Sequence, residues 1–164
     1  MMDSLHVRPA LATDAAGIAA VHLQSWRETY VEQLPASTLA ALAESEFTER
    51  WAGILRGGDT AVWVAVLGPT VIGWASTGTG RDSERPHELE LEGIYVVASH
   101  HGAGAGQLLI DAAIGQRDAY LWMAVGNERA LAFYRRNGFA PDGTVSTKEL
   151  RGTPVEVMRL TRTF

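Results

Sequence analysis

Hydrophobic residues follow two different periods along this 164-residue chain, and the period separates expected helices from expected strands. From Asp14 to about Tyr30, apolar residues recur at spacings of three and four, which predicts an amphipathic helix with Asp14 as its N-cap. Apolar runs at 61–67 and 71–77 are joined by a short Gly-Pro turn, which is typical of an antiparallel hairpin. Across 87–97, glutamates alternate with leucines, which predicts a strand with one acidic face.

The rest of the chain continues the same pattern. Further strands are expected at 5–8, 119–125, 139–150 and 155–160, and further helices at 35–42, 47–55, 104–114 and 127–138, the last capped by Asn127. The expected order is β-α-α-β-β-β-α-β-α-β-β. The sequence contains neither an internal repeat nor a linker long enough to divide it, so we expect one α/β domain over residues 1–164.

Composition narrows the kinds of site and partner. Cysteine is absent, which excludes disulfides, thiolate metal ligands and a cysteine nucleophile. The net charge is −5, and no basic stripe is available to neutralise a phosphate backbone, so nucleic acid is not an expected partner. No apolar run approaches the roughly 20 residues of a membrane span, and the N-terminal residues lack the pattern of a signal peptide. We therefore expect a cytoplasmic protein that binds neither nucleic acid nor membrane.

A glycine-rich stretch lies where the strand at 87–97 gives way to the next helix. Gly102, Gly104 and Gly106 alternate there with alanines. Such a loop can turn its backbone N–H groups toward a bulky anion, and the helix N-terminus that follows adds free donors and a positive dipole end. A pyrophosphate would fit this loop. A tight turn that only permits strand–helix packing explains the same spacing equally well.

Several other motifs fail on detail. A nucleotide P-loop requires Gly-Lys-Ser/Thr, whereas Gln107 follows Gly106 here. A Rossmann fingerprint requires an acidic residue about 20 residues further on, where this chain has Ala124. No serine-hydrolase elbow surrounds Ser76. The adjacent His100 and His101 lack the further ligands of a metal site, so no metal is expected.

A second stretch of interest runs from Asn127 to Phe139. Asn127 and Tyr134 are seven residues apart, which puts them on one helix face with a rise of roughly 10 Å between them. A helix cap would explain Asn127, and core packing would explain Tyr134. Taken singly, each residue therefore has a structural explanation.

Together the two stretches resemble motifs A and B of the GNAT superfamily of N-acetyltransferases. Motif A has Gln/Arg-x-x-Gly-x-Gly/Ala after a strand that ends aliphatic-Tyr-Val, matched here by 94–96 and 101–106. Motif B has an Asn, a Tyr seven residues on and then Gly-Phe, matched by Asn127, Tyr134 and 138–139. The likeness extends over nearly the whole chain. It implies a mixed, mostly antiparallel sheet of about seven strands flanked by about four helices, an α+β arrangement.

The resemblance also implies an activity and a set of roles. The protein would be an acetyl-CoA-dependent N-acetyltransferase without a metal, in which an amine attacks the thioester directly in a ternary complex. The pantetheine arm would bond the backbone of Ile94, Tyr95 and Val96 like an extra strand. Asn127 would contact the cosubstrate, and Tyr134 would be the general acid toward the leaving thiolate. The pyrophosphate would lie on Gly102, Ala103, Gly104, Ala105, Gly106 and Gln107. One residue departs from the family, because His101 stands at the head of the loop where Gln or Arg is usual.

The attacking amine must lose a proton, so a base is also required. Glu90 is the first candidate, directly or through a water, because it lies on the strand that would hold the pantetheine, and Glu92 is the second. Glu88 shares their face unless a bulge intervenes, and a solvated acidic surface explains the three glutamates equally well. A carboxylate-lined cleft would suit a cationic amine. Trp26 and Tyr30, four residues apart on the first helix, are weaker candidates for acceptor binding, since core packing also explains them.

Two functions of other classes remain as alternatives. A catalytically idle acyl-CoA-binding module, serving as a sensor or scaffold, would need neither Tyr134 nor the acidic residues. An unrelated nucleotide-binding domain would be stabilised by ATP or NAD rather than by CoA. The spacing of residues carries no code for the acceptor, which could be a small amine or an amine of a peptide or protein. A homodimer is compatible with the resemblance.

Overall fold

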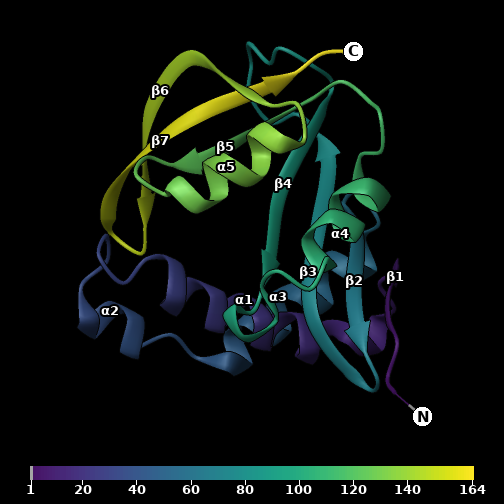
Figure 1. Ribbon diagram of the computed structural model, residues 1–164. Coiled ribbons are helices and arrows are strands. Elements are labelled where there is room, and N and C mark those ends of the chain that lie inside the picture. Colours follow the sequence, from purple (N-terminus) through teal and green to yellow (C-terminus); the bar gives the residue numbers. More distant parts are fainter. Residues whose placement is uncertain (1) are drawn as a thin grey trace.

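A computed structural model describes residues 2–164 of the chain, and these residues form a seven-stranded sheet (Figure 1). The strands are arranged in the order β1-β2-β3-β4-β5-β7-β6. All neighbouring strands are antiparallel except β4 and β5, which are parallel. The expected mixed, mostly antiparallel sheet is therefore confirmed. The strand bounds are β1 (Leu5–Pro9), β2 (Ala61–Leu67), β3 (Thr70–Thr79), β4 (Leu89–Val96), β5 (Ala119–Ala124), β6 (Ala140–Leu150) and β7 (Thr153–Arg162).

Residues 2–164 form five α-helices, one for each of the five stretches whose pattern predicts a helix, whereas the resemblance implied about four. Asp14 precedes α1 as expected, but its side chain does not cap that helix. One carboxylate oxygen of Asp14 instead accepts a 2.7 Å hydrogen bond from the backbone N–H of Leu11, and both oxygens bond Arg8. None of the described helices is both long and apolar enough to cross a membrane. The helix bounds are α1 (Ala15–Thr29), α2 (Ala36–Ala40), α3 (Glu44–Gly57), α4 (Ala105–Ala113) and α5 (Glu128–Arg136).

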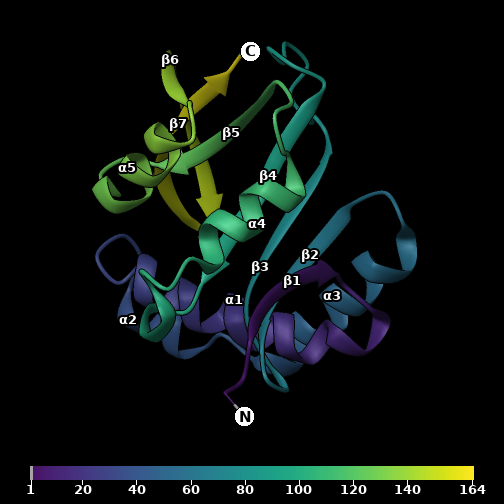
Figure 2. The ribbon, with the colours of Figure 1, turned by 45° about the vertical axis from the view of Figure 1, so that its right-hand side comes forward.

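Different helices cover the two faces of the sheet. Successive residues of a strand point to opposite faces, and β3 shows this at Gly73 and Trp74. Trp74 packs against His22 of α1 and Trp51 of α3. A side chain at Gly73 would instead meet Leu109 of α4. It follows that α1 and α3 lie on one face and α4 on the other, as Figure 2 shows from a second side.

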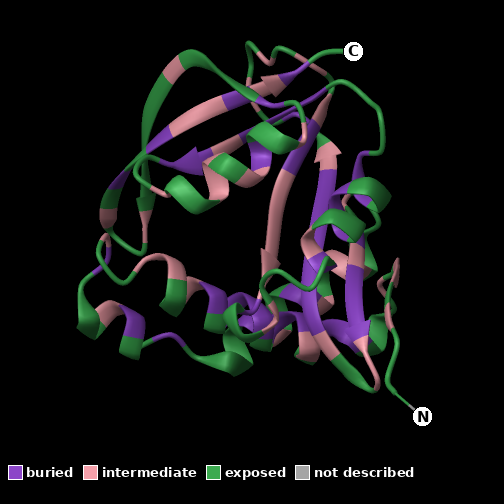
Figure 3. Cartoon of the chain, viewed as in Figure 1, coloured by how far each residue is buried: buried purple, intermediate pink, exposed green. Residues whose placement is uncertain are grey.

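The apolar core fills both interfaces between sheet and helices. Val64 and Ala75 in the middle of the sheet are fully buried, as are Ile18 of α1 and Leu109 of α4. Figure 3 shows the same division, with the central strands buried and the outward faces of the helices exposed. The sheet is thus a rigid layer between two helical layers, and it holds the strands that form the site.

The pairing of β4 with β5 is confined to a single residue pair, Glu90 and Tyr120. Just beyond this pair β4 contains a bulge, because Leu91 lies opposite Thr77 while Gly93 lies opposite Ser76. Glu92 is therefore the extra residue of β4. A bulge bends the strand that contains it, and β4 continues to Val96 with β3 as its partner on one side only.

The closeness of β3 and β4 depends on Gly73, which leads to a first prediction. A Cβ atom at this position would lie 2.9 Å from the carbonyl oxygen of Tyr95. Because that neighbour is backbone and cannot turn away, we expect Gly73→Ala to lower the free energy of unfolding by about 1–3 kcal/mol. Urea unfolding with an unchanged m-value measures this loss.

Gly57 is the matched control for this substitution. It ends α3, and a Cβ atom added there would meet nothing within 4 Å. Because alanine favours helix over glycine by up to about 1 kcal/mol, Gly57→Ala should be neutral or stabilising. Equal stability of Gly73→Ala and the unmodified protein would show that Gly73 does not set the spacing of the two strands.

Candidate active site

A cavity of about 740 Å³ lies where β4 and β5 diverge. Residues 91–96 of β4 and 122–124 of β5 form two of its walls, and the end of α1 and one face of α5 form the others. Ile94, Tyr95 and Val96, expected to hold the pantetheine arm, all line this cavity. Since β4 has no partner there on the β5 side, an extended chain could bond it as an added strand.

The glycine loop between β4 and α4 is a row of free donors. Gly102 and Gly104 have φ values of 80° and 92°, and a side chain at either would meet nothing within 4 Å. Within the described part of the chain, no backbone N–H from Gly102 to Gln107 donates a hydrogen bond. The N–H groups at the start of α4 are the unpaired donors of any helix N-terminus, and the exposed Gly102 and Ala103 extend this row of donors into the loop. The loop therefore fits a pyrophosphate group.

The two ends of the loop make different contacts. His101 at its head and Gly106 at its foot border the cavity. Gly106 lies against α5, because a Cβ atom there would be 3.4 Å from the Phe133 ring. The side chain of Gln107 donates to Asn137 at the end of α5, over 2.8 Å. The loop and the start of α4 are thus held alongside α5.

Asn127 and Tyr134 both line the cavity, as their shared helix face predicts. Asn127 also caps α5, since its side-chain oxygen accepts a 3.1 Å hydrogen bond from the backbone N–H of Ala130. Tyr134 is only 9% exposed. Burial, and secondarily the neighbouring Tyr30, raises the pKa of the Tyr134 phenol, so it keeps its proton at neutral pH. A protonated phenol in this position can donate to a group bound in the cavity.

The two weaker candidates for acceptor binding, Trp26 and Tyr30, differ in their relation to the cavity. Tyr30 lines the cavity, whereas Trp26 is not among the lining residues. The indole of Trp26 packs edge-on against Tyr30, at 5.3 Å between ring centroids, and against Phe47 of α3. Trp26 thus supports Tyr30 from the core, and Tyr30 is the member of the pair that can touch a ligand.

Glu90, the first candidate for the base, lies outside the cavity wall and is fully engaged elsewhere. It is 1% exposed. Its carboxylate accepts bonds from the guanidinium of Arg81, at 2.7 and 3.1 Å, from the Arg81 backbone N–H and from the Tyr120 hydroxyl. Burial alone would raise its pKa, but the bonds from Arg81 outweigh burial and lower it. A carboxylate held in this way is a poor proton acceptor, and its geometry is structural.

Glu92 differs from Glu90 because of the bulge that the sequence could not locate. As the extra residue of β4, Glu92 lines the cavity. Burial raises the pKa of its carboxyl, nearby Glu90 adds to the effect, and Arg81 opposes it. Glu88 is exposed and paired with Arg85 over 3.0 Å. Among the three alternating glutamates, the structure therefore brings Glu92 alone to the cavity.

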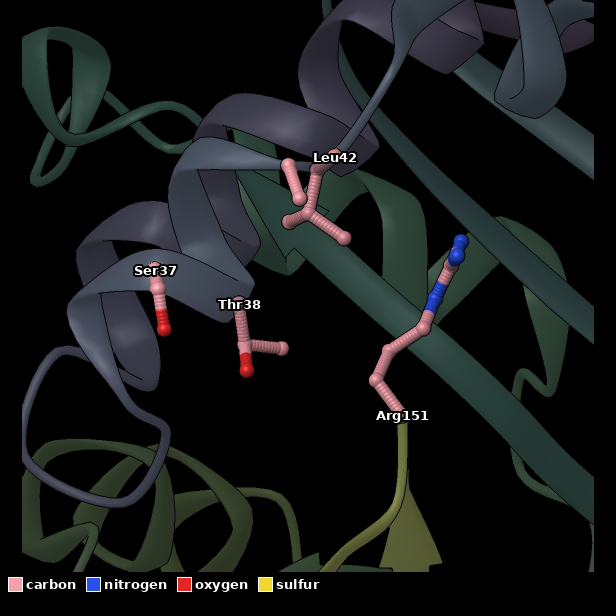
Figure 4. A pocket seen from close by; sticks show the side chains of 5 residues that line it. Ser37, Thr38, Leu42 and Arg151 are labelled. Atoms are coloured by element: carbon pink, nitrogen blue, oxygen red, sulfur yellow. The ribbon is translucent and has the colours of Figure 1, made fainter.

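A smaller pocket of about 330 Å³ lies between α2 and the tip of the β6–β7 hairpin (Figure 4). Ser37 and Thr38 of α2 face it, and Arg151 lines it from the hairpin. Arg151 has a φ of 52°, unusual for a residue other than glycine. Its guanidinium forms a 2.8 Å ion pair with Glu46 and lies 5.4 Å from the Phe47 ring centroid. Arg151 therefore braces the hairpin tip against α3.

Sequence reasoning passed over several residues that the structure brings to the cavity. Arg129 borders it in the first turn of α5, close to His101. The sequence signal that could have pointed to Arg129 is its position two residues after Asn127, which was itself expected at the site. Ser25 and Gln33 also line the cavity, and each has a buried side-chain oxygen with no hydrogen-bond partner. No group of three or more His, Asp or Glu residues within 2–164 is arranged to hold a metal ion.

Comparison with known proteins gives three kinds of match. The sequence profile described as Acetyltransferase (GNAT) family matches residues 23–139. A protein of Mycobacterium tuberculosis named as a probable N-acetyltransferase is 28% identical over 159 residues, which cover 93% of this chain and 90% of that one.

Two solved structures have a similar fold over almost the full length of each chain. The PaiA N-acetyltransferase of Thermoplasma acidophilum, in complex with coenzyme A, matches with a TM-score of 0.69 at 16% identity, over 98% of this chain and 99% of that one. The ribosomal-protein-alanine N-acetyltransferase of Brucella melitensis matches with a TM-score of 0.71 at 21% identity, over 96% and 99%. At these identities the likeness establishes the fold.

The bonding of Glu90 leads to a second prediction, on stability. A group whose folded pKa is lowered stabilises the fold above its unfolded pKa, and this contribution is lost as pH falls through the folded value. We therefore expect Glu90→Gln to cost about 1–3 kcal/mol at neutral pH, and the cost to shrink as pH falls below the ordinary carboxyl value of 4.5. Urea unfolding of both proteins at pH 7 and at acid pH measures the difference. A cost that is equal at the two pH values would contradict the role of the charged form.

Proposed function

Because the chain belongs to the GNAT acetyltransferase family, we propose that this enzyme transfers an acetyl group from acetyl-CoA to a primary amine by direct attack in a ternary complex. One observation carries the proposal. A single cavity joins the unpaired edge of β4 at 94–96 to the head of the glycine loop and to Tyr134. Cosubstrate and acceptor can therefore meet in one space, next to an acid.

Two features, one in the cavity and one in the loop that borders it, suit acetyl-CoA. The free N–H groups from Gly102 to Gln107 suit the pyrophosphate, and the open edge of Ile94 to Val96 suits the amides of the pantetheine arm. Asn127 lies beside both, at the start of α5. The coenzyme A complex of the Thermoplasma neighbour supports this assignment of the cosubstrate.

Tyr134 is proposed as the general acid. In the reaction, the amine nitrogen bonds the thioester carbon, the carbon–sulfur bond breaks, and the thiolate takes up a proton. A thiolate has a conjugate-acid pKa of about 8.5, so it needs a nearby donor to leave readily at neutral pH. The raised pKa of Tyr134 keeps the phenol protonated, so that it can donate a hydrogen bond to the sulfur as negative charge develops there.

We assign the role of base to Glu92 in place of Glu90. Glu92 lines the cavity and has a raised pKa, whereas the carboxylate of Glu90 is occupied by Arg81 and Tyr120. A base with a pKa closer to neutrality accepts a proton from an ammonium more readily. The proton would pass from the amine to Glu92 directly or through a water.

The acceptor is proposed to be a cationic amine. Glu32 and Glu92 are among the residues that line the cavity, and Gln33, which also lines it, has a buried side-chain oxygen without a partner. Such a set accepts hydrogen bonds, which an ammonium group donates. The Brucella neighbour is named for an alanine of a ribosomal protein, whereas a small amine satisfies the same groups here.

The test of the activity is release of CoA thiol from acetyl-CoA in the presence of a panel of amines. We expect turnover with at least one cationic amine. Binding of CoA without turnover for any amine would favour the alternative of an idle acyl-CoA-binding module. Stabilisation by ATP or NAD rather than by CoA would favour a nucleotide-binding domain.

The role of Tyr134 leads to a third prediction. Tyr134→Phe is expected to lower kcat by about 10²–10⁴-fold, because the variant loses the proton donor while retaining the ring. Calorimetric CoA binding should stay close to that of the unmodified enzyme. The thermal unfolding midpoint of Tyr134→Phe without ligand is the control, since it shows whether loss of the buried hydroxyl disturbs the fold. Unchanged kcat in Tyr134→Phe would exclude it as the acid.

The two glutamates give a fourth prediction, on pH dependence. A base acts when deprotonated, so kcat/KM should fall as pH drops toward the pKa of Glu92, which lies above 4.5. Glu92→Gln should lose about 10²–10⁴-fold in kcat/KM and lose this acid limb. Glu90→Gln, assayed at a pH where it remains folded, should keep the kcat/KM of the unmodified enzyme and the fall in kcat/KM at acid pH. The reverse result would return the role of base to Glu90.

A further inference from the structure

Two groups compete for one nitrogen of His101 at the head of the glycine loop. The Nε2 atom lies 2.7 Å from the carbonyl oxygen of Val96 and 3.1 Å from Nη1 of Arg129. With a hydrogen, this nitrogen donates to the carbonyl; without one, it accepts from the guanidinium. A neutral imidazole cannot do both at the same atom. One of the two contacts is therefore weak in any given state of the ring.

Arg129 has no carboxylate partner to hold it. It takes part in none of the ion pairs formed by residues 2–164. Its side chain borders the cavity in the first turn of α5. Packing of Phe133 against Gly106, and the bond from Gln107 to Asn137, hold α5 alongside the loop. An exposed guanidinium without a carboxylate partner thus lies beside His101 at the head of the loop.

The carbonyl of Val96 connects this arrangement to the cosubstrate. Val96 lies on the β4 edge that the pantetheine arm would bond, an assignment that rests on the proposed function. An amide N–H of the arm that bonds the Val96 carbonyl would take the place of His101 there. The Nε2 atom could then accept from Arg129 without competition. Binding of the arm would therefore favour the His101–Arg129 contact.

We infer that Arg129, which lies beside His101 at the head of the loop, binds the pyrophosphate of acetyl-CoA from α5. An arginine can donate two parallel hydrogen bonds to phosphate oxygens, which suits this position. His101 is a positioning residue that orients the guanidinium. The loop would hold the pyrophosphate through backbone N–H groups, and Arg129 would bind it from the facing helix.

Calorimetric binding of CoA and of 3′-dephospho-CoA tests the inference. Both ligands carry the pyrophosphate, and the second lacks the 3′-phosphate. Arg129→Ala should weaken binding of both by the same factor, about tenfold or more, as expected for loss of a charged hydrogen bond. Arg135→Ala is the matched control, because Arg135 lies on the same helix, is exposed and does not line the cavity. It should leave both affinities within about twofold.

The outcomes separate the inference from the proposed function. If the unmodified protein fails to bind CoA, the proposed function itself is wrong. If it binds CoA and Arg129→Ala binds equally well, Arg129 makes no contact and the inference is overturned. A loss with CoA alone would assign Arg129 to the 3′-phosphate and overturn the pyrophosphate contact. An equal loss of affinity in Arg135→Ala would show that the effect comes from the net charge of the protein, and this result would also overturn the inference. Unfolding midpoints without ligand check that each variant is folded.

The part assigned to His101 is tested by a double-mutant cycle. His101→Ala should weaken CoA binding in the unmodified background but have no effect when Arg129 is already alanine. His101→Gln, whose amide oxygen can accept from the guanidinium, should restore binding. A loss from His101→Ala that is the same in both backgrounds would show that His101 acts independently of Arg129.

Discussion

The single backbone pairing between β4 and β5, at Glu90 and Tyr120, is the constraint on which the rest of the site depends. The two strands meet at this pair, near the start of each, and toward their C-terminal ends they separate around the cavity. The same two residues join their side chains in a buried hydrogen bond, and Arg81 completes the cluster. A carboxylate paired in this way is costly to disturb. The fork in the sheet therefore stays open at a defined position.

The bulge in β4 places two neighbouring acidic residues in different environments. Without it, Glu90 and Glu92 would share one face and one environment. With it, Glu90 joins the buried cluster that closes the fork, while Glu92 turns to the cavity that the fork opens. The two carboxyl groups then differ in pKa in opposite directions, for reasons that lie in their immediate neighbours. One inserted residue thus gives the two glutamates different surroundings.

Local sequence patterns predicted the elements well, because strands and helices here obey their own periods. The spacing from Asn127 to Tyr134 placed both residues at the cavity, and residues 94–96 line it as well. The choice between Glu90 and Glu92 was beyond the sequence for a definite reason. A bulge depends on register with β3, and the contacts of Arg81 and Tyr120 with Glu90 span 9 and 30 residues of sequence. Arg129 was missed for the same reason, since its relation to His101 spans 28 residues.

The brace between Arg151 and Glu46 has a consequence for the solvent in which the enzyme works. Both side chains are partly exposed, at 34% and 57%. Mobile ions screen exposed charges over a Debye length of about 8 Å at physiological ionic strength, and over less in concentrated salt. Added salt should therefore loosen the hairpin tip from α3 more than it loosens the Glu90 cluster, where the carboxylate itself is 2% exposed although Arg81 is 61% exposed. The hairpin tip would then soften before the fork between β4 and β5 as the medium becomes more saline.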